Sequence, residues 1–259
     1  MRILMLNPSP RNPNAGPTSH NRIQALLQSY CSPGTTIDNA YPDDFEGARV
    51  GQSMNAQSVL TGLHHATTMS AYIQKIVWAE QNGYDAVIQS NTFDPGVEAA
   101  RLAVRIPVIG VMRTTVHSAA TLADRIGITV PLPGHVPYTR RILRSYGLDH
   151  FITDVRPVGV YGENMDERKE ELFQAAVETM RGVIRDTDPE CIIPLGGALI
   201  PYIVDPDDLA REVGVPVLNT KTITIRFAET CVNLGLSHSP KTYPTAKLNP
   251  EDFSAYAFR

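Results

Sequence analysis

The chain has 259 residues, of which 42% are hydrophobic and 19% charged, and its formal net charge is −4. This length can bury one large core or two lobes of about 100 to 130 residues each. The acidic balance lacks the basic stripe of a nucleic-acid-binding protein. No apolar run reaches roughly 18 to 20 residues, and the apolar core of MRILMLNPSP is shorter than we expect of a signal peptide. We therefore expect a cytoplasmic globular protein with a small-molecule substrate and no nucleic-acid or membrane partner; homo-oligomerisation stays open.

The first half of the chain alternates strand and helix patterns. Residues 2–6 (RILML) form a short apolar run that a turn-rich loop ends, and residues 71–82 show helical spacing up to Gly83. A strand follows in YDAVIQS, then the loop NTFDPG, in which Asp94 is the expected N-cap of a helix over 97–105. The apolar run IPVIGV, residues 106–111, is the next expected strand. Such alternation is typical of βαβ units around a parallel sheet.

The pattern then recurs in the second half. Residues 188–219 read as a strand, a small-residue turn, an Asp-rich helix start, a helix and a strand containing VPV. This order matches residues 85–110, with about three extra residues, and it favours an internal duplication over coincidence among generic α/β units. The predicted fold is α/β, with two pseudo-symmetric lobes, each a mainly parallel sheet flanked by helices. Residues 1–112 with 220–259 form the first lobe and residues 113–219 the second.

Ligands of parallel α/β sheets bind beyond the carboxyl ends of the strands. If the lobes face each other, three strand-end loops converge: NPSPRN, SNTFDPG and LGGALIPY. The active site is therefore expected in the cleft between the lobes.

Several segments resemble the Asp/Glu racemase superfamily, in particular its hydantoin racemase branch. The matching segments run nearly end to end in the same order: RILMLNP, DAVI, DPGVEAAR, IPVIGV, TTVHSAATLADRIGITV, RRILRSYGLD, IIPLGGA and GLSHSPKTYP. The resemblance implies two α/β lobes and proton transfer by a pair of cysteines, one at the end of each of two equivalent strands, without metal or organic cofactor. Low-pKa thiols suit this task, since acid–base catalysis is efficient near the working pH.

Other residues occupy the two positions at which the resemblance implies cysteines. The hydantoin-type register places Asn91 at the first and Gly197 at the second; a register like that of glutamate racemases, shifted by one, places Ser90 at the first. The cysteines at positions 31, 191 and 231 have no CxxC or His spacing that would suggest zinc or a disulfide framework. His64 and His65 are not expected to share one helix face, so no metal site is predicted.

The candidate site residues lie at predicted strand ends and helix starts, where many polar residues also serve only as turn formers or packing residues. The catalytic candidates are Asn91, Thr92, His117, Tyr202 and Lys221. The candidate substrate-binding residues are Asn7, Ser9, Ser90, Thr114, Gly196, Gly197 and Ala198.

Three functions fit these residues. The first is a cofactor-free enzyme of the racemase superfamily that acts on a small polar carbonyl, ureide or carboxylate compound by non-cysteine chemistry. The second is a hydrolase or lyase that uses an oxyanion pocket at Asn91, Thr92 and the Gly197 turn. The third is a binding protein that has the ligand cleft without the chemistry. Measurement of turnover separates the third from the other two.

Overall fold

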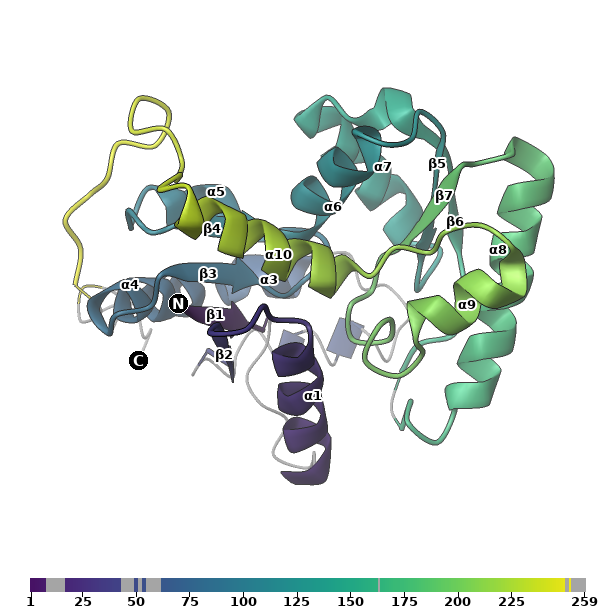
Figure 1. Ribbon diagram of the computed structural model, residues 1–259, viewed down its shortest axis with the longest axis horizontal. Helices are drawn as coiled ribbons and strands as arrows, with labels where there is room; N and C mark the ends of the chain where they lie inside the picture. The colour runs from purple at the N-terminus through teal and green to yellow at the C-terminus, as the bar shows by residue number, and fades with distance from the viewer. Residues whose placement is uncertain are drawn as a thin grey trace. The chain divides into compact units, whose positions relative to one another are not determined.

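Figure 1 shows the computed structural model, in which the chain forms two compact units, each with its own parallel β-sheet. The structure describes residues 1–7, 17–42, 49–50, 53–54, 62–162, 164–249 and 252. Unit 1 comprises the described residues within Met1–Gln52, Gly62–Val111 and Thr224–Arg259, and unit 2 consists mainly of Met112–Ile223. The beginning and the end of the described chain thus belong to the same unit.

The sheet of unit 1 contains four parallel strands in the order β2-β1-β3-β4. The strands are β1 (Arg2–Leu6), β2 (Thr36–Ala40), β3 (Ala86–Gln89) and β4 (Val108–Gly110). All residues of β3 and β4 and all but the first of β1 are buried. Strands buried on both faces are apolar along their whole length, which explains the continuous apolar runs in the sequence.

Helices of unit 1 pack on this sheet. They are α1 (Pro17–Ser29), α3 (Leu63–Thr67), α4 (Met69–Gln81) and α5 (Val97–Arg101). The chain passes between the units within α6 (Val111–Ala120) and again within α10 (Thr220–Asn233). The core joins buried side chains of β1, β3, α4 and α5, among them Leu4, Leu6, Tyr72, Ile76, Val77, Val87 and Val97.

Unit 2 has a sheet of three parallel strands in the order β6-β5-β7. They are β5 (Ile126–Val130), β6 (Ile152–Pro157) and β7 (Cys191–Pro194). The helical segments are α7 (His135–Tyr146), the 3-10 turn η1 (Asp149–Phe151), α8 (Lys169–Thr187) and α9 (Pro206–Val213). The core on one side of the sheet includes Leu172, Ala176, Val177, Met180, Ile192, Leu199, Leu209 and Val217.

The two sheets share one topology. In unit 1, β1 lies between β2 and β3, and β4 pairs with β3; in unit 2, β5 lies between β6 and β7, and Val217 makes a parallel bridge to Ile192 of β7. The helices follow the same order, with α4 and α8 before β3 and β7, and α5 and α9 after them. The predicted α/β fold with two similar, mainly parallel sheets flanked by helices is confirmed.

Some expected boundaries were wrong. The strand expected over 106–111 is limited to β4, because Val111 already begins α6. The helix expected over 97–105 ends at Arg101. The N-cap of α5 is Gly96, with φ 76°, and not Asp94. By contrast, Asp205 caps α9 as the Asp-rich pattern predicts, since its carboxylate accepts a 2.9 Å hydrogen bond from the backbone N of Asp207.

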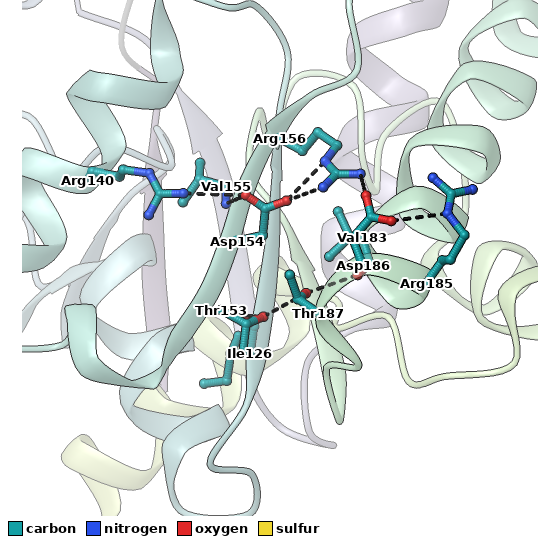
Figure 2. Close-up of polar contacts among 10 residues, drawn as sticks. All are labelled: Ile126, Arg140, Thr153, Asp154, Val155, Arg156, Val183, Arg185, Asp186 and Thr187. Atoms are coloured by element: carbon teal, nitrogen blue, oxygen red, sulfur yellow. Dashed lines mark hydrogen bonds and ion pairs between the residues drawn. The ribbon is translucent and has the colours of Figure 1, made fainter.

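A charged network joins β6 to α8 on the surface of unit 2 (Figure 2). Arg156 contacts Asp154 at 2.6 Å and Asp186 at 3.0 Å, while Arg140 and Arg185 approach these carboxylates from either side. A hydrogen bond from Arg156 lowers the pKa of Asp186. Because these ion pairs lie on the surface and most of their side chains are partly exposed, the network adds little stability.

Among the described residues, no helix combines the length and apolarity that a membrane crossing requires. In the same part of the chain, no group of three histidine, cysteine or acidic side chains is arranged to hold a metal ion.

Candidate active site

The loop after β3 forms a polar centre at the carboxyl edge of the unit 1 sheet. Gln89, the last residue of β3, is 1% exposed and ties this loop together. Its Nε2 donates to the carbonyl of Pro95 at 2.9 Å, and its Oε1 accepts from the backbone N of Asn91 at 2.5 Å. A buried amide that is bonded at both ends holds the loop in one conformation. Gln89 was not among the predicted site residues.

Asn91 is half-buried at the tip of this loop, and its amide group is held on both sides. Its Oδ1 accepts a 2.8 Å hydrogen bond from the backbone N of Phe93, as in an Asx turn. Its Nδ2 lies 3.1 Å from Nε2 of His65, which belongs to α3. An amide nitrogen carries two hydrogens, so one N–H of Asn91 remains for a further acceptor.

The neighbours of Asn91 are more deeply buried. Ser90 is 5% and Thr92 1% exposed, so Asn91 is the most accessible of the three. Asp94 adopts a left-handed backbone conformation with φ 51° and is 6% exposed. Its carboxyl carbon would be 2.6 Å from a Cβ at Gly110, so the close packing of Asp94 requires glycine at the end of β4.

Asn7 follows β1 at the same edge, and its side-chain amide donates hydrogen bonds to other residues of unit 1. Its Nδ2 donates to Oδ1 of Asn39 at 2.6 Å and to the carbonyl of Ala40 at 2.8 Å. Nδ2 of Asn39 donates in turn to the hydroxyl of Tyr41 at 3.2 Å. Both N–H groups of Asn7 are thus engaged, and a ligand would meet its carbonyl oxygen. Ser9, also predicted here, lies outside the described residues.

The turn after β7 occupies the equivalent edge of unit 2. The backbone N of Leu195 donates to Thr129 of β5 at 2.8 Å, just as Ser90 donates to Leu6 of β1 at 2.8 Å. This register places Gly196 opposite Asn91 in the repeat, and therefore Gly197 opposite Thr92.

Gly196 is in a conformation that excludes a side chain. Its φ is +105°, and an added Cβ would overlap the ring of Pro131. The carbonyl of Gly196 accepts from the backbone N of Leu199 at 2.8 Å, which closes the turn. Gly197 is buried, whereas Ala198 is exposed. This strand tip offers backbone groups where unit 1 offers an amide side chain.

A buried lysine follows the bridge that pairs with β7. Lys221 is 0% exposed, and its Nζ lies 5.4 Å from the centre of the Tyr202 ring, which is 6% exposed. Oδ1 of Asn219 accepts from the backbone N of Lys221 at 3.1 Å and of Thr222 at 3.0 Å, so Asn219 caps the start of α10 and fixes the lysine backbone. Val217 pairs with β7 just before this cap, which places Lys221 at the carboxyl edge of the unit 2 sheet.

Two further candidates, Thr114 and His117, lie on α6. Thr114 is 8% exposed, and His117 projects as an exposed side chain. Partial desolvation of the ring, followed by the charge of Arg113, lowers the pKa of His117. No contact seen among residues that the structure describes joins Thr114 or His117 to another candidate.

The three cysteines lie away from both strand tips. Cys31 follows α1, Cys191 is the first residue of β7, and Cys231 lies in α10. Burial raises the pKa of Cys31 and of Cys191 to about 11 and also raises that of Cys231. These thiols are therefore protonated at neutral pH.

The structure thus groups Asn91 with His65 and Gln89 in unit 1, and Lys221 with Tyr202 in unit 2. His64 and His65 were considered only as metal ligands. Although neighbouring positions of a helix were not expected to share one face, the two rings contact each other, with centroids 3.8 Å apart, and both side chains of this α3 pair are buried. The two adjacent histidines in the sequence were the signal that could have drawn attention to His65 as a site residue.

Comparison with known proteins assigns the family. The profile of the Asp/Glu/Hydantoin racemase family matches residues 11–228. Over 212 residues the chain is 29% identical to the hydantoin racemase of Pseudomonas sp. (strain NS671). This alignment covers 79% of this chain and 82% of that protein. It is 27% identical over 252 residues to the hydantoin racemase of Rhizobium meliloti, covering 96% and 93%.

Among solved structures, the allantoin racemase from Pseudomonas fluorescens has the same fold, with a TM-score of 0.75 at 23% identity over 96% of this chain and 98% of that one. The chain belongs to the Asp/Glu/hydantoin racemase family and is an enzyme of the isomerase type.

Proposed function

We propose that the protein is a cofactor-free racemase or epimerase of a small ureide, carboxylate or related carbonyl compound, and that it transfers protons with an amine instead of a thiol. Relatives that are hydantoin racemases, and a structural neighbour that is an allantoin racemase, favour a ring ureide within this class. The reacting centre of such a compound is a C–H bond next to a carbonyl group. Its inversion needs a base to remove the proton and an acid to return one.

The observation that carries the proposal is the fully buried Lys221 beside Tyr202. A lysine is rarely buried to this extent, and a desolvated amine is a recognised form of catalytic base. Its place beyond the carboxyl ends of parallel strands is where ligands of α/β sheets bind. The expected thiol positions hold Asn91 and a glycine turn, while Cys191 and Cys231 are buried, Cys31 is half-buried, and none of the three lies in the turns that follow β3 and β7.

In the proposed reaction, the neutral amine of Lys221 takes the proton from the stereocentre. The C–H bonding electrons move toward the carbonyl carbon, and the negative charge develops on the carbonyl oxygen. Backbone N–H groups of the glycine turn at residues 196–198 are suited to stabilise that oxygen, since a glycine backbone permits close approach. A water molecule on the opposite face then donates a proton to the carbon, which inverts the centre, and the ammonium of Lys221 returns its proton to the hydroxide that remains.

Polarimetry with single enantiomers of 5-substituted hydantoins, allantoin, aspartate and glutamate tests the proposal. We expect loss of optical rotation with the wild-type protein for at least one ureide. Lys221→Met and Lys221→Arg should both lower the rate by about 100- to 10,000-fold, the usual contribution of a general acid or base. The arginine keeps the positive charge but is not a base, which separates proton transfer from charge stabilisation.

Lys75→Met is the matched control, because Lys75 also lies over an aromatic ring, 4.6 Å from that of Trp78, but on helix α4. This variant should keep the wild-type rate. Binding without loss of rotation would identify a binding protein, and ring opening with retained configuration would identify a hydrolase; either result contradicts the proposal. So would racemisation that survives both substitutions at Lys221.

A further inference from the structure

The contact between Asn91 and His65 determines which nitrogen of His65 carries a proton. It plays no part in the proton transfer proposed for Lys221. Both residues belong to unit 1, and both nitrogens of the contact are identified: Nδ2 of Asn91 and Nε2 of His65, 3.1 Å apart. Two nitrogen atoms form a hydrogen bond only if one of them carries a hydrogen and the other has a free lone pair.

Phe93 settles which end of the Asn91 amide faces the histidine. The backbone N–H of Phe93 is a donor only, and it bonds to the acceptor end, Oδ1, at 2.8 Å. If the amide were turned over, its NH2 group would face this N–H, and two donors would oppose each other. The NH2 group of Asn91 therefore faces His65.

The protonation state of His65 follows from this orientation. The amide NH2 group can only donate, so Nε2 of His65 must accept and carries no proton. A neutral imidazole then holds its proton on Nδ1. Protonation of Nε2 would place N–H groups against each other and would turn the Asn91 amide away from Phe93.

Helix α3 holds the histidine in place for this contact. The hydroxyl of Thr68, itself 0% exposed, donates to the carbonyls of His64 and His65 at 3.0 and 3.2 Å. The ring of His64 packs against that of His65 with a centroid distance of 3.8 Å. Both rings are less than 8% exposed, so the imidazole has little freedom to rotate.

We infer that His65 is a positioning residue: in its Nδ1–H form it binds one N–H of Asn91 at Nε2 and directs the second N–H toward a substrate oxygen. The last part of this inference rests on the proposed function, whereas the tautomer of His65 does not. Asn91 contacts the substrate in this account, and His65 acts through it.

The tautomer is measured without any substrate. Two-bond 1H–15N correlation spectra of the labelled protein at pH 7.5 report the protonation of each imidazole nitrogen, and the spectrum of His65→Gln assigns the His65 signals among the seven histidines. We expect unprotonated Nε2 and protonated Nδ1. In Asn91→Asp, a carboxylate oxygen faces Nε2, and the proton should move to that nitrogen. A wild-type His65 with Nε2–H overturns the inference.

Kinetics test the positioning role. His65→Leu removes the acceptor and should lower kcat/KM about tenfold to a hundredfold, the usual cost of a displaced substrate-binding group. His65→Gln offers an amide oxygen as acceptor and should recover most of that loss. In the background of Asn91→Ala, His65→Leu should have no further effect. Equal rates for wild type and His65→Leu, or an undiminished loss in the double variant, overturn the role of His65.

The NMR experiment and the kinetic experiment together separate this inference from the proposed function. If no substrate is racemised while His65 has the expected tautomer, the proposed function fails and the positioning of Asn91 stands. If racemisation depends on Lys221 but not on His65, the proposed function stands and this inference fails.

Discussion

The tips of β3 and β7 occupy the same position in two copies of one topology, yet they present different chemistry. After β3 the chain has Ser90, Asn91 and Thr92, and the amide of Asn91 is bonded to His65 and Phe93. After β7 it has Leu195 and two glycines, and the base that we propose for this unit, Lys221, belongs to helix α10. The repeat thus determines where a functional group can be placed but not which group it is.

The cause of the difference lies in the backbone. Asn91 has room for a side chain, whereas Gly196 lies against Pro131 in a left-handed conformation. A thiol cannot stand at Gly196 without movement of the turn. The lysine that we propose as the base therefore comes from another element, helix α10.

Within unit 1, the largest effect is expected for Asn91→Ala. Loss of a preorganised donor to a developing oxyanion typically lowers turnover about 100- to 1,000-fold, or roughly 3 to 4 kcal/mol. Loss of the bond to Phe93 should cost only about 1 kcal/mol of folding free energy. Turnover and thermal unfolding of the same preparation measure both quantities. Near-wild-type turnover in folded Asn91→Ala would move the site to Ser90 or away from this strand tip.

Substitution of the equivalent residue in unit 2 should act on stability instead. Gly196→Ala combines an unfavourable backbone conformation with the clash against Pro131, each worth about 1 to 3 kcal/mol. Chemical denaturation of this variant measures the sum. Gly214→Ala is the control, because Gly214 also has a positive φ, +79°, but no atom within 4 Å of the added Cβ. Equal losses for the two variants would show that the clash with Pro131 is absent.

A smaller effect is expected on the stability of the fold at acid pH. The buried Glu229 of unit 1 should contribute to it more than the carboxylates of the surface network of unit 2. Burial acts to raise the pKa of Glu229, but hydrogen bonds from Ser32 and Thr35 and the charge of Arg226 lower it on balance. A carboxylate with a lowered folded-state pKa stabilises the fold above its unfolded pKa of about 4.3 and loses this contribution as the pH falls through the folded value.

We therefore expect Glu229→Gln to flatten the decline of the unfolding midpoint below about pH 4.5, measured by circular dichroism. Asp186→Asn, in the exposed network of Figure 2, should leave that decline nearly unchanged, because solvent screens its ion pairs. A larger change for Asp186→Asn than for Glu229→Gln would reverse the ranking of the two regions.

The smallest effect is expected for thiol alkylation. With pKa values of about 11, Cys31 and Cys191 are almost entirely protonated at pH 7.5 and react slowly. Iodoacetamide treatment followed by polarimetry should leave the racemisation rate unchanged. Rapid inactivation with labelling of one cysteine, identified by mass spectrometry, would restore a thiol mechanism.

The sequence was sufficient to predict the strands β1, β3, β4 and β7 and the edge where the candidates lie, but not β2, β5 and β6, and the strand expected at VPV is only the bridge of Val217 to Ile192. Apolar runs such as RILML and DAVI identify buried strands because both faces of a parallel strand are covered. The resemblance to the racemase superfamily was confirmed by the family match. Boundaries failed where a helix begins inside an apolar run, as at Val111, since a buried strand and a buried helix start have the same composition.

The contacts within the site could not be predicted. His65 and Asn91 are 26 residues apart, and only the fold brings Nε2 to the amide. The burial of Lys221 was also hidden, because a lysine after a strand is usually solvated. Gly196 opposite Asn91 became apparent only from the backbone hydrogen bonds, since the sequence register had placed Gly197 there.

The central claim, proton transfer by Lys221, is tested most directly by deuterium exchange at the stereocentre. A single enantiomer of a 5-substituted hydantoin or of allantoin is incubated in D2O, and loss of the C–H signal is followed by 1H NMR. The wild-type protein should exchange this hydrogen, and Lys221→Met should do so about 100- to 10,000-fold more slowly while unfolding at the same temperature. Exchange at the wild-type rate in folded Lys221→Met would contradict the account.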